Sequence, residues 1–144
     1  MILLTDEQLG EIAQELEIGM VCYVHQQTGE LIVFPNPEQF TYGDTGDWQE
    51  SIDTVEASPD DYWPIHPMTS FESFQVMERF VEVLPANHFR TRLITILNQP
   101  KPFRHFKQAV DESDYRENWF AFRDGEMAHW LRQKLVNMNA LRAE

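Results

Sequence analysis

The chain has 144 residues and a net charge of −13 at neutral pH, and 42% of its residues are hydrophobic. This length and apolar content predict one folded domain over residues 1–144 and exclude disorder of the whole chain. The acidic balance opposes direct binding to nucleic acids and to anionic membrane surfaces, because like charges repel.

The charge is divided unevenly along the chain. Residues 1–78 contain 16 acidic residues and no Lys or Arg, whereas residues 79–144 contain 8 acidic and 11 basic residues. The first stretch therefore carries −16 and the second +3. Two interpretations follow: the two stretches attract each other within one fold, or the acidic stretch faces a basic protein partner.

The single cysteine and the N-terminal residues favour a cytoplasmic protein. Cys22 has no second cysteine with which to form an intrachain disulfide, so the fold does not depend on an oxidising compartment. Residues 1–10 lack the basic start and apolar run of a secretory signal. The sequence also lacks the run of about 18 apolar residues that a membrane span needs.

Residues 5–18 carry the clearest helix pattern. Thr5 and Gln8 have the spacing of a capping box, and Gly19 is placed to end the helix. One apolar stripe at helical spacing comprises Leu9, Ile12, Ala13 and Leu16.

The next elements are predicted to be strands. Residues 20–25 and 31–34 are rich in β-branched and aromatic residues, and the turn residues between them indicate a hairpin. Residues 62–65 favour a third strand, which Pro64 would confine to an edge of the sheet.

Residues 36–61 read as an acidic loop or insertion within the domain. An alternative is that part of this segment is helical, because Trp48, Ile52 and Val55 follow helical spacing. Long loops without secondary structure are uncommon in compact domains. We therefore expect some helical packing in this segment.

The remainder of the chain predicts helices in series. The first covers about residues 70–84, and Thr69 with Glu72 forms a second capping-box pattern. Further helices are expected over about 87–98, from Pro102, and from about residue 114, with a break at Asp124–Gly125 before a final helix. The predicted fold is α+β: an N-terminal helix, a small antiparallel sheet, then four to five C-terminal helices packed together.

Three stretches of the sequence carry a family resemblance. They are the capped first helix with its hairpin turn Thr28-Gly29-Glu30, the stretch from Ser70 to Phe80, and the set Phe103-Arg104-His105-Phe106-Lys107 with residues 119–124 and 130–131. With them the chain resembles a bacterial family of the uncharacterised UPF series, number 0158. The resemblance implies an intracellular bacterial α+β protein without an established activity, and it brings no catalytic residues. Segment 36–61 matches the family least.

Motifs for metal, nucleotide or nucleophilic chemistry are absent from the sequence. The five histidines do not pair at helical ligand spacing, and the sequence has no CxxC, EF-hand, P-loop or GxSxG pattern. Cys22 lies in a predicted strand and is expected to face the core as a small hydrophobic residue. We predict no metal, no cofactor and no catalytic residues.

Aromatic and basic residues gather in the C-terminal half. Arg104 and Lys107 lie beside Phe103 and Phe106, and the next helix carries Trp119 and Arg123. The candidate binding residues are Arg104, Lys107, Trp119 and Arg123. In one interpretation these residues only stabilise the fold, and in the other the aromatic rings anchor a partner that the arginines orient.

Three functions from different classes remain open at this point. The first is a non-enzymatic binding or regulatory module that acts through protein–protein contacts. The second is an enzyme or small-ligand binder with a cleft between the sheet and the C-terminal helices, for which His105, Arg104, Tyr115 and Arg123 are the residues to inspect. The third is an acidic mimic of nucleic acid. The sequence specifies no oligomeric state.

Overall fold

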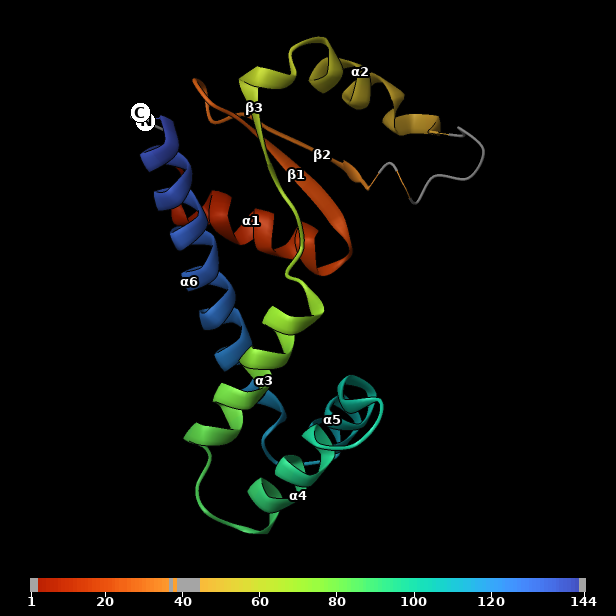
Figure 1. Cartoon of the computed structure of the whole chain (residues 1–144), viewed down its shortest axis with the longest axis vertical. Helices are drawn as coiled ribbons and strands as arrows, with labels where there is room; N and C mark the ends of the chain where they lie inside the picture. The colour runs from red at the N-terminus through yellow and green to blue at the C-terminus, as the bar shows by residue number, and fades with distance from the viewer. Residues whose placement is uncertain (1–2, 37, 39–44, 143–144) are drawn as a thin grey trace. The chain divides into compact units, whose positions relative to one another are not determined.

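A computed structural model describes residues 3–36, 38 and 45–142 of the chain. The fold is α+β, as predicted: an N-terminal helix, a three-stranded antiparallel sheet and then a series of helices (Figure 1). The chain divides into two compact units. The sheet unit comprises Met1–Pro67 with Ala128–Glu144, and the helical unit comprises Met68–Met127. That residues 1–144 form one domain stays a prediction.

The sheet contains the hairpin and the edge strand that the sequence predicted. Strand β1 (Met20–His25) lies between β2 (Leu31–Pro35) and β3 (Tyr62–Ile65), and both pairings are antiparallel. Pro64 lies on edge strand β3 opposite Tyr23. An edge strand tolerates proline because one side of its backbone has no partner strand that needs an N–H donor.

The hairpin turn is stabilised by a side chain. The Nδ1 atom of His25 accepts hydrogen bonds from the backbone amides of Gln27 and Thr28, each at 3.2 Å. Gly29 follows with a φ of +74°, a conformation that a residue with a Cβ adopts at a cost. The turn therefore depends on the histidine acceptor as well as on the predicted glycine.

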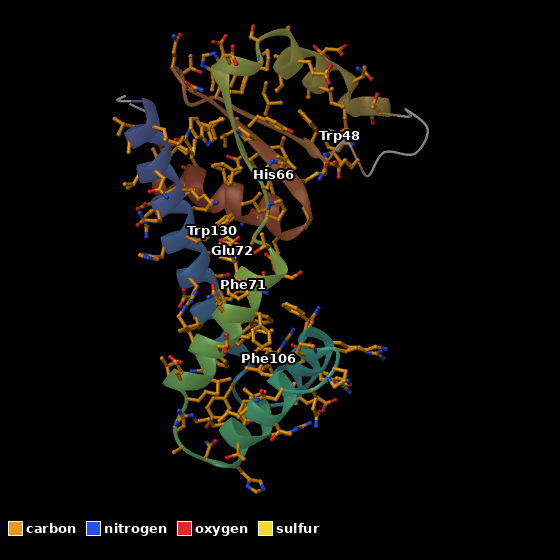
Figure 2. The ribbon with its side chains drawn as sticks, viewed as in Figure 1. Trp48, His66, Phe71, Glu72, Phe106 and Trp130 are labelled. Atoms are coloured by element: carbon orange, nitrogen blue, oxygen red, sulfur yellow. The ribbon has the colours of Figure 1, made fainter. Side chains whose placement is uncertain are left out.

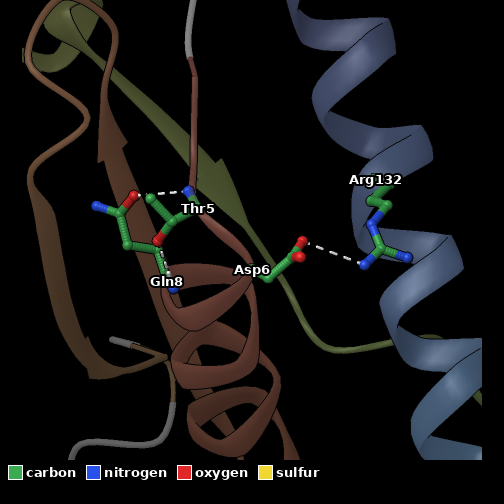
Figure 3. A network of polar contacts seen from close by, with 4 residues as sticks. All are labelled: Thr5, Asp6, Gln8 and Arg132. Carbon is green, nitrogen blue, oxygen red and sulfur yellow. Dashed lines mark hydrogen bonds and ion pairs between the residues drawn. The ribbon is translucent and has the colours of Figure 1, made fainter.

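Helix α1 (Asp6–Glu17) packs against β1. Its capping box is present, as predicted: the Thr5 hydroxyl accepts from the Gln8 amide, and the Gln8 side chain accepts from the Thr5 amide (Figure 3). Cys22 of β1 is fully buried, as expected for a small core residue. The carboxylates of Glu11 and Glu15 on α1 act electrostatically on this thiol, so the Cys22 face of the sheet is the one that α1 covers.

Helix α2 (Gln49–Ala57) covers the other face of the sheet. Its buried residues Ile52 and Val55 form a cluster with Phe34 of β2, and the ring of Tyr23 stacks on Phe34 with 4.5 Å between centroids. Short 3-10 helices, η2 (Gly46–Trp48) and η3 (Pro59–Asp61), flank α2. The expected helical packing within segment 36–61 is confirmed, although residues 37 and 39–44 lie outside the described residues.

The helical unit is built around an aromatic core. It contains α3 (Ser70–Val83), α4 (His88–Leu97), α5 (Pro102–Asp111) and the first part of α6 (Arg116–Arg142). The Phe80 ring of α3 meets Phe106 of α5 and Trp119 of α6 edge-on or nearly so, at 6.3 and 5.2 Å between centroids (Phe106 is labelled in Figure 2). The predicted capping box of Thr69 and Glu72 opens α3.

The predicted helix break at Asp124–Gly125 is wrong. Helix α6 continues without interruption from Arg116 to Arg142. A single glycine costs a helix about 1 kcal/mol relative to alanine, which a helix of this length tolerates. A two-point ion pair also holds the next turn, because Nε and Nη2 of Arg79 donate to Oε1 and Oε2 of Glu126 at 3.0 Å each.

The last part of α6 belongs to the sheet unit. Leu131 and Met138, which share one face of the helix, are buried there. Arg132 forms an ion pair with Asp6 in the first turn of α1, with 3.3 Å between Nη2 and Oδ1 (Figure 3). Both side chains are largely exposed, so this pair contributes little to stability.

Candidate functional site

Trp119, one of the four predicted binding residues, lies in the core of the helical unit. Its side chain is 9% exposed, and its ring lies 5.2 Å from the centroid of Phe80 and 5.0 Å from that of Phe106. A ring held this way adds packing energy to the core through its edge-on contacts. Trp119 therefore supports the helices that carry the other three residues.

Arg104 and Lys107 lie together on the outer face of α5. Both side chains are exposed, and with Gln108 they line a shallow groove of about 430 Å³. Asp111 and Glu112 close this groove at the C-terminal end of the helix. Within the part of the chain that the structure describes, neither Arg104 nor Lys107 has an ion-pair partner.

Arg123 is partly buried on α6 and contacts its own helix. Its guanidinium carbon lies 5.1 Å from the centre of the Phe120 ring, and its Nη2 atom lies 3.8 Å from Asp124. Arg116 lies at the same 5.1 Å from that ring. The structure thus brings Arg104 and Lys107 together, whereas Arg123 is engaged with Phe120. The binding role of the four residues stays a prediction.

A second groove, of about 420 Å³, runs between α4 and α5. Its polar lining includes Arg92 from α4, Gln99 just after α4, and His105 and Gln108 from α5. Arg92 and Gln99 were not among the predicted residues. The sequence contains a signal for Arg92 but none for Gln99: the stretch between Glu82 and Asp111 contains five basic residues, Arg92 among them, and no acidic one.

A separate surface of the sheet unit is strongly acidic. Six carboxylates of segment 45–61 are exposed around α2, and none of them has an ion-pair partner among the described residues. We call this set the α2 acidic face; it consists of Asp47, Glu50, Asp53, Glu56, Asp60 and Asp61. For the three carboxylates on α2 itself, helical spacing explains the exposure, because Ile52 and Val55 turn toward the sheet and leave the other side of the helix to water. Asp47 lies on η2, and Asp60 and Asp61 lie on η3.

Cys22 is poorly suited to act as a nucleophile. Burial, together with the smaller effect of the nearby carboxylates of Glu15 and Glu11, raises the pKa of its thiol from 9.0 to about 12. Because the thiolate is the reactive form, the buried thiol is inert near neutral pH.

The described residues contain no cluster of three or more His, Cys, Asp or Glu side chains arranged to hold a metal ion. In that same part of the chain, no helix has the length and apolar character needed to cross a membrane.

The sequence model of the uncharacterised protein family UPF0158 matches residues 5–142. Neither a curated protein nor a solved structure matches the chain. The match spans both units and includes the three stretches that carried the resemblance. The chain belongs to the uncharacterised protein family UPF0158.

Proposed function

We propose that this protein is a non-enzymatic binding module and that its α2 acidic face binds a basic protein. One observation carries the proposal: none of the six carboxylates has an ion-pair partner among the described residues. Carboxylates that stabilise a fold through ion pairs have a cation within about 4 Å. These carboxylates are instead free to meet cations from outside.

The position of α2 supports the same proposal. Ile52 and Val55 anchor the helix on the sheet, so its outward side chains are presented on a packed element. Glu50, Asp53 and Glu56 recur at every third position and share the outer side of the helix. A basic surface would be steered to this face by long-range attraction, and the association would weaken as salt rises.

The test is affinity capture from a cell lysate with the wild-type protein and a variant of α2. The variant carries Glu50→Gln, Asp53→Asn and Glu56→Gln. We expect basic proteins to be retained by the wild type at low salt, released at high salt, and lost from the variant. Quantitative mass spectrometry of the two captures provides the measurement.

A matched control removes three exposed carboxylates elsewhere, through Glu7→Gln, Glu11→Gln and Glu117→Gln. It has the same net charge as the α2 variant, so it separates the α2 acidic face from overall charge. Equal loss of partners from both variants, or no salt-sensitive partner of the wild type, would contradict the proposal. A captured partner must then bind the wild type directly, as purified proteins, with the same salt dependence.

A further inference from the structure

The outer face of α5 is the part of the helical unit where cations concentrate. Phe106, Ala109 and Val110 are buried on one side of this helix. Apart from Phe103 near the start of the helix and Asp111 at its end, the exposed side chains are cationic, imidazole or amide groups. They are Arg104, His105, Lys107 and Gln108, with Lys101 at the start of the helix.

Helix α4 extends this surface through the groove of about 420 Å³. Arg92 and Thr95 of α4 and Gln99 just after it contribute to the lining, with His105 and Gln108 of α5. Each polar side chain of this lining can donate a hydrogen bond, and none of them is a carboxylate. We call the set Arg92, Lys101, Arg104, His105 and Lys107 the α4–α5 basic face.

The cations of this face do not serve the fold. Within the described residues, Arg92, Arg104 and Lys107 form no ion pair. Arg79 and Arg116 of the same unit do, with Glu126 and Asp111. Asp111 and Glu112 lie at the end of the groove that Arg104 and Lys107 line, and Asp111 pairs with Arg116. Cations that have no ion-pair partner of their own attract an anionic partner from outside.

We propose that the α4–α5 basic face binds the phosphate backbone of a nucleic acid. Phosphate oxygens only accept hydrogen bonds, and guanidinium, ammonium and amide groups donate them. A protein partner would instead need an aromatic or aliphatic anchor at the centre of the face. Phe103 lies beside these cations and is 42% exposed, with its ring 6.4 Å from that of Phe74 of α3 between centroids. A protein partner would use this ring, whereas a phosphate backbone needs only the cations, and competition by polyglutamate distinguishes the two.

The acidic net charge of the chain opposes direct nucleic-acid binding, but this charge is not distributed uniformly over the two units. The helical unit contains 9 acidic and 8 basic residues, a net charge of −1, whereas the sheet unit contains 15 acidic and 3 basic residues, a net charge of −12. At physiological salt, charges more than about 8 Å apart are largely screened. Binding to the basic face then depends on the cations nearest to the phosphates.

The test is fluorescence anisotropy with the full chain and two labelled probes, a short single-stranded RNA and a duplex DNA of the same sequence. We expect at least one probe to bind with an affinity that falls with salt, with a log–log slope of about −3 for four phosphates contacted. The variant carrying Arg104→Gln and Lys107→Gln should bind about tenfold more weakly, with a slope smaller by about 1.5. Which probe binds better identifies the kind of nucleic acid.

A matched control carries Arg132→Gln and Lys134→Gln, which remove two exposed cations from the sheet unit. It should bind as the wild type does, and circular dichroism melting checks that both variants are folded. Equal weakening in the control, no binding of either probe at low salt, or equal competition by polyglutamate would overturn the proposal. The α2 variant should keep nucleic-acid binding, which separates this proposal from the one for the α2 acidic face.

Discussion

The sheet unit and the helical unit use charge in different ways. The sheet unit carries −12, and the carboxylates of its α2 acidic face have no ion pair among the described residues. The helical unit carries −1, and several of its charges are paired, most closely Arg79 with Glu126. The net charge of −13 therefore describes neither surface. Charge along a chain predicts a surface only after the fold shows which charges neutralise each other.

The two units also differ in their cores. The core of the helical unit is a set of aromatic rings centred on Phe80, which contacts Phe106, Trp119 and Phe122. The sheet unit instead buries mostly aliphatic residues between α1, the sheet and α2, with Cys22 and the ring of Phe34 among them. Substitutions in each core can show how far the two units depend on each other.

The largest expected effect comes from Phe80→Ala. Removing this buried ring should lower the free energy of unfolding by about 3–5 kcal/mol, because the cavity is lined by other rings that cannot close over it. Urea unfolding followed by circular dichroism measures the loss. Hydrogen–deuterium exchange, resolved by peptide, shows which unit is affected. Val83→Ala, an exposed change on the same helix, is the control.

The same experiment tests the prediction of a single domain. If residues 1–144 form one domain, both units should lose protection from exchange together in Phe80→Ala. Loss confined to the helical unit would show that the two units unfold separately and that the prediction is wrong.

Cys22→Ser probes the core of the sheet unit. A hydroxyl placed in the position of the buried thiol would lack a partner, so we expect a loss of about 1–3 kcal/mol. Urea unfolding measures it, with Cys22→Ala as the variant that adds no polar group. A loss no larger in Cys22→Ser than in Cys22→Ala would show that the hydroxyl finds a hydrogen bond.

Alkaline pH offers a second test of Cys22. Its folded pKa is raised to about 12, above the unfolded value of 9.0. The protonated thiol therefore contributes stability that is fully present below pH 9.0 and is lost as pH rises toward about 12. The stability of the wild type should fall more steeply in this window than that of Cys22→Ala. Parallel curves would contradict the burial argument.

The two capping boxes allow a matched comparison of the units. Thr5→Ala removes the cap of α1 in the sheet unit, and Thr69→Ala removes that of α3 in the helical unit. Each should cost about 1 kcal/mol in urea unfolding, because backbone amides lose their acceptor. Thr91→Ala, within α4, is the control and should be near neutral. If either cap variant unfolds with the same free energy as the wild type, that capping box does not contribute to the stability of the protein.

Lys101→Gly should stabilise the helical unit. Lys101 has a φ of 56°, in the left-handed region, at the residue before α5. Glycine adopts this conformation without a Cβ clash, so we expect a gain of about 0.5–1 kcal/mol and a higher melting temperature. Lys101→Ala removes the same charge without relieving the backbone, and it should give no gain.

The smallest effects are expected for the two predicted binding arginines. Arg104→Met should change stability by less than about 0.5 kcal/mol, because its side chain is exposed and has no ion pair among the described residues. Arg123→Met should cost up to about 1 kcal/mol through the lost contact with Phe120. Thermal melting checks both. A large loss in Arg104→Met would mean that this residue serves the fold.

Local patterns in the sequence were sufficient to predict most of the helices and strands. Both capping boxes, the hairpin and the edge strand at Pro64 were predicted because each depends on residues within a few positions of one another. The break at Gly125 was not present, because the preference of one glycine is weaker than the packing of a long helix. The effect of a single residue such as Gly125 on a helix therefore depends also on contacts with residues that are distant in sequence.

The sequence by itself determined the α+β class, the family and the placement of acidic residues in the first half of the chain. Only the tertiary structure decided which charges remain unpaired and which surfaces carry them. Trp119 is a core residue because α6 packs its ring against Phe80 and Phe106. Arg92 belongs to the α4–α5 basic face because α5 lies beside α4. Binding depends on side chains brought together in space, and spacing along a chain does not specify that arrangement.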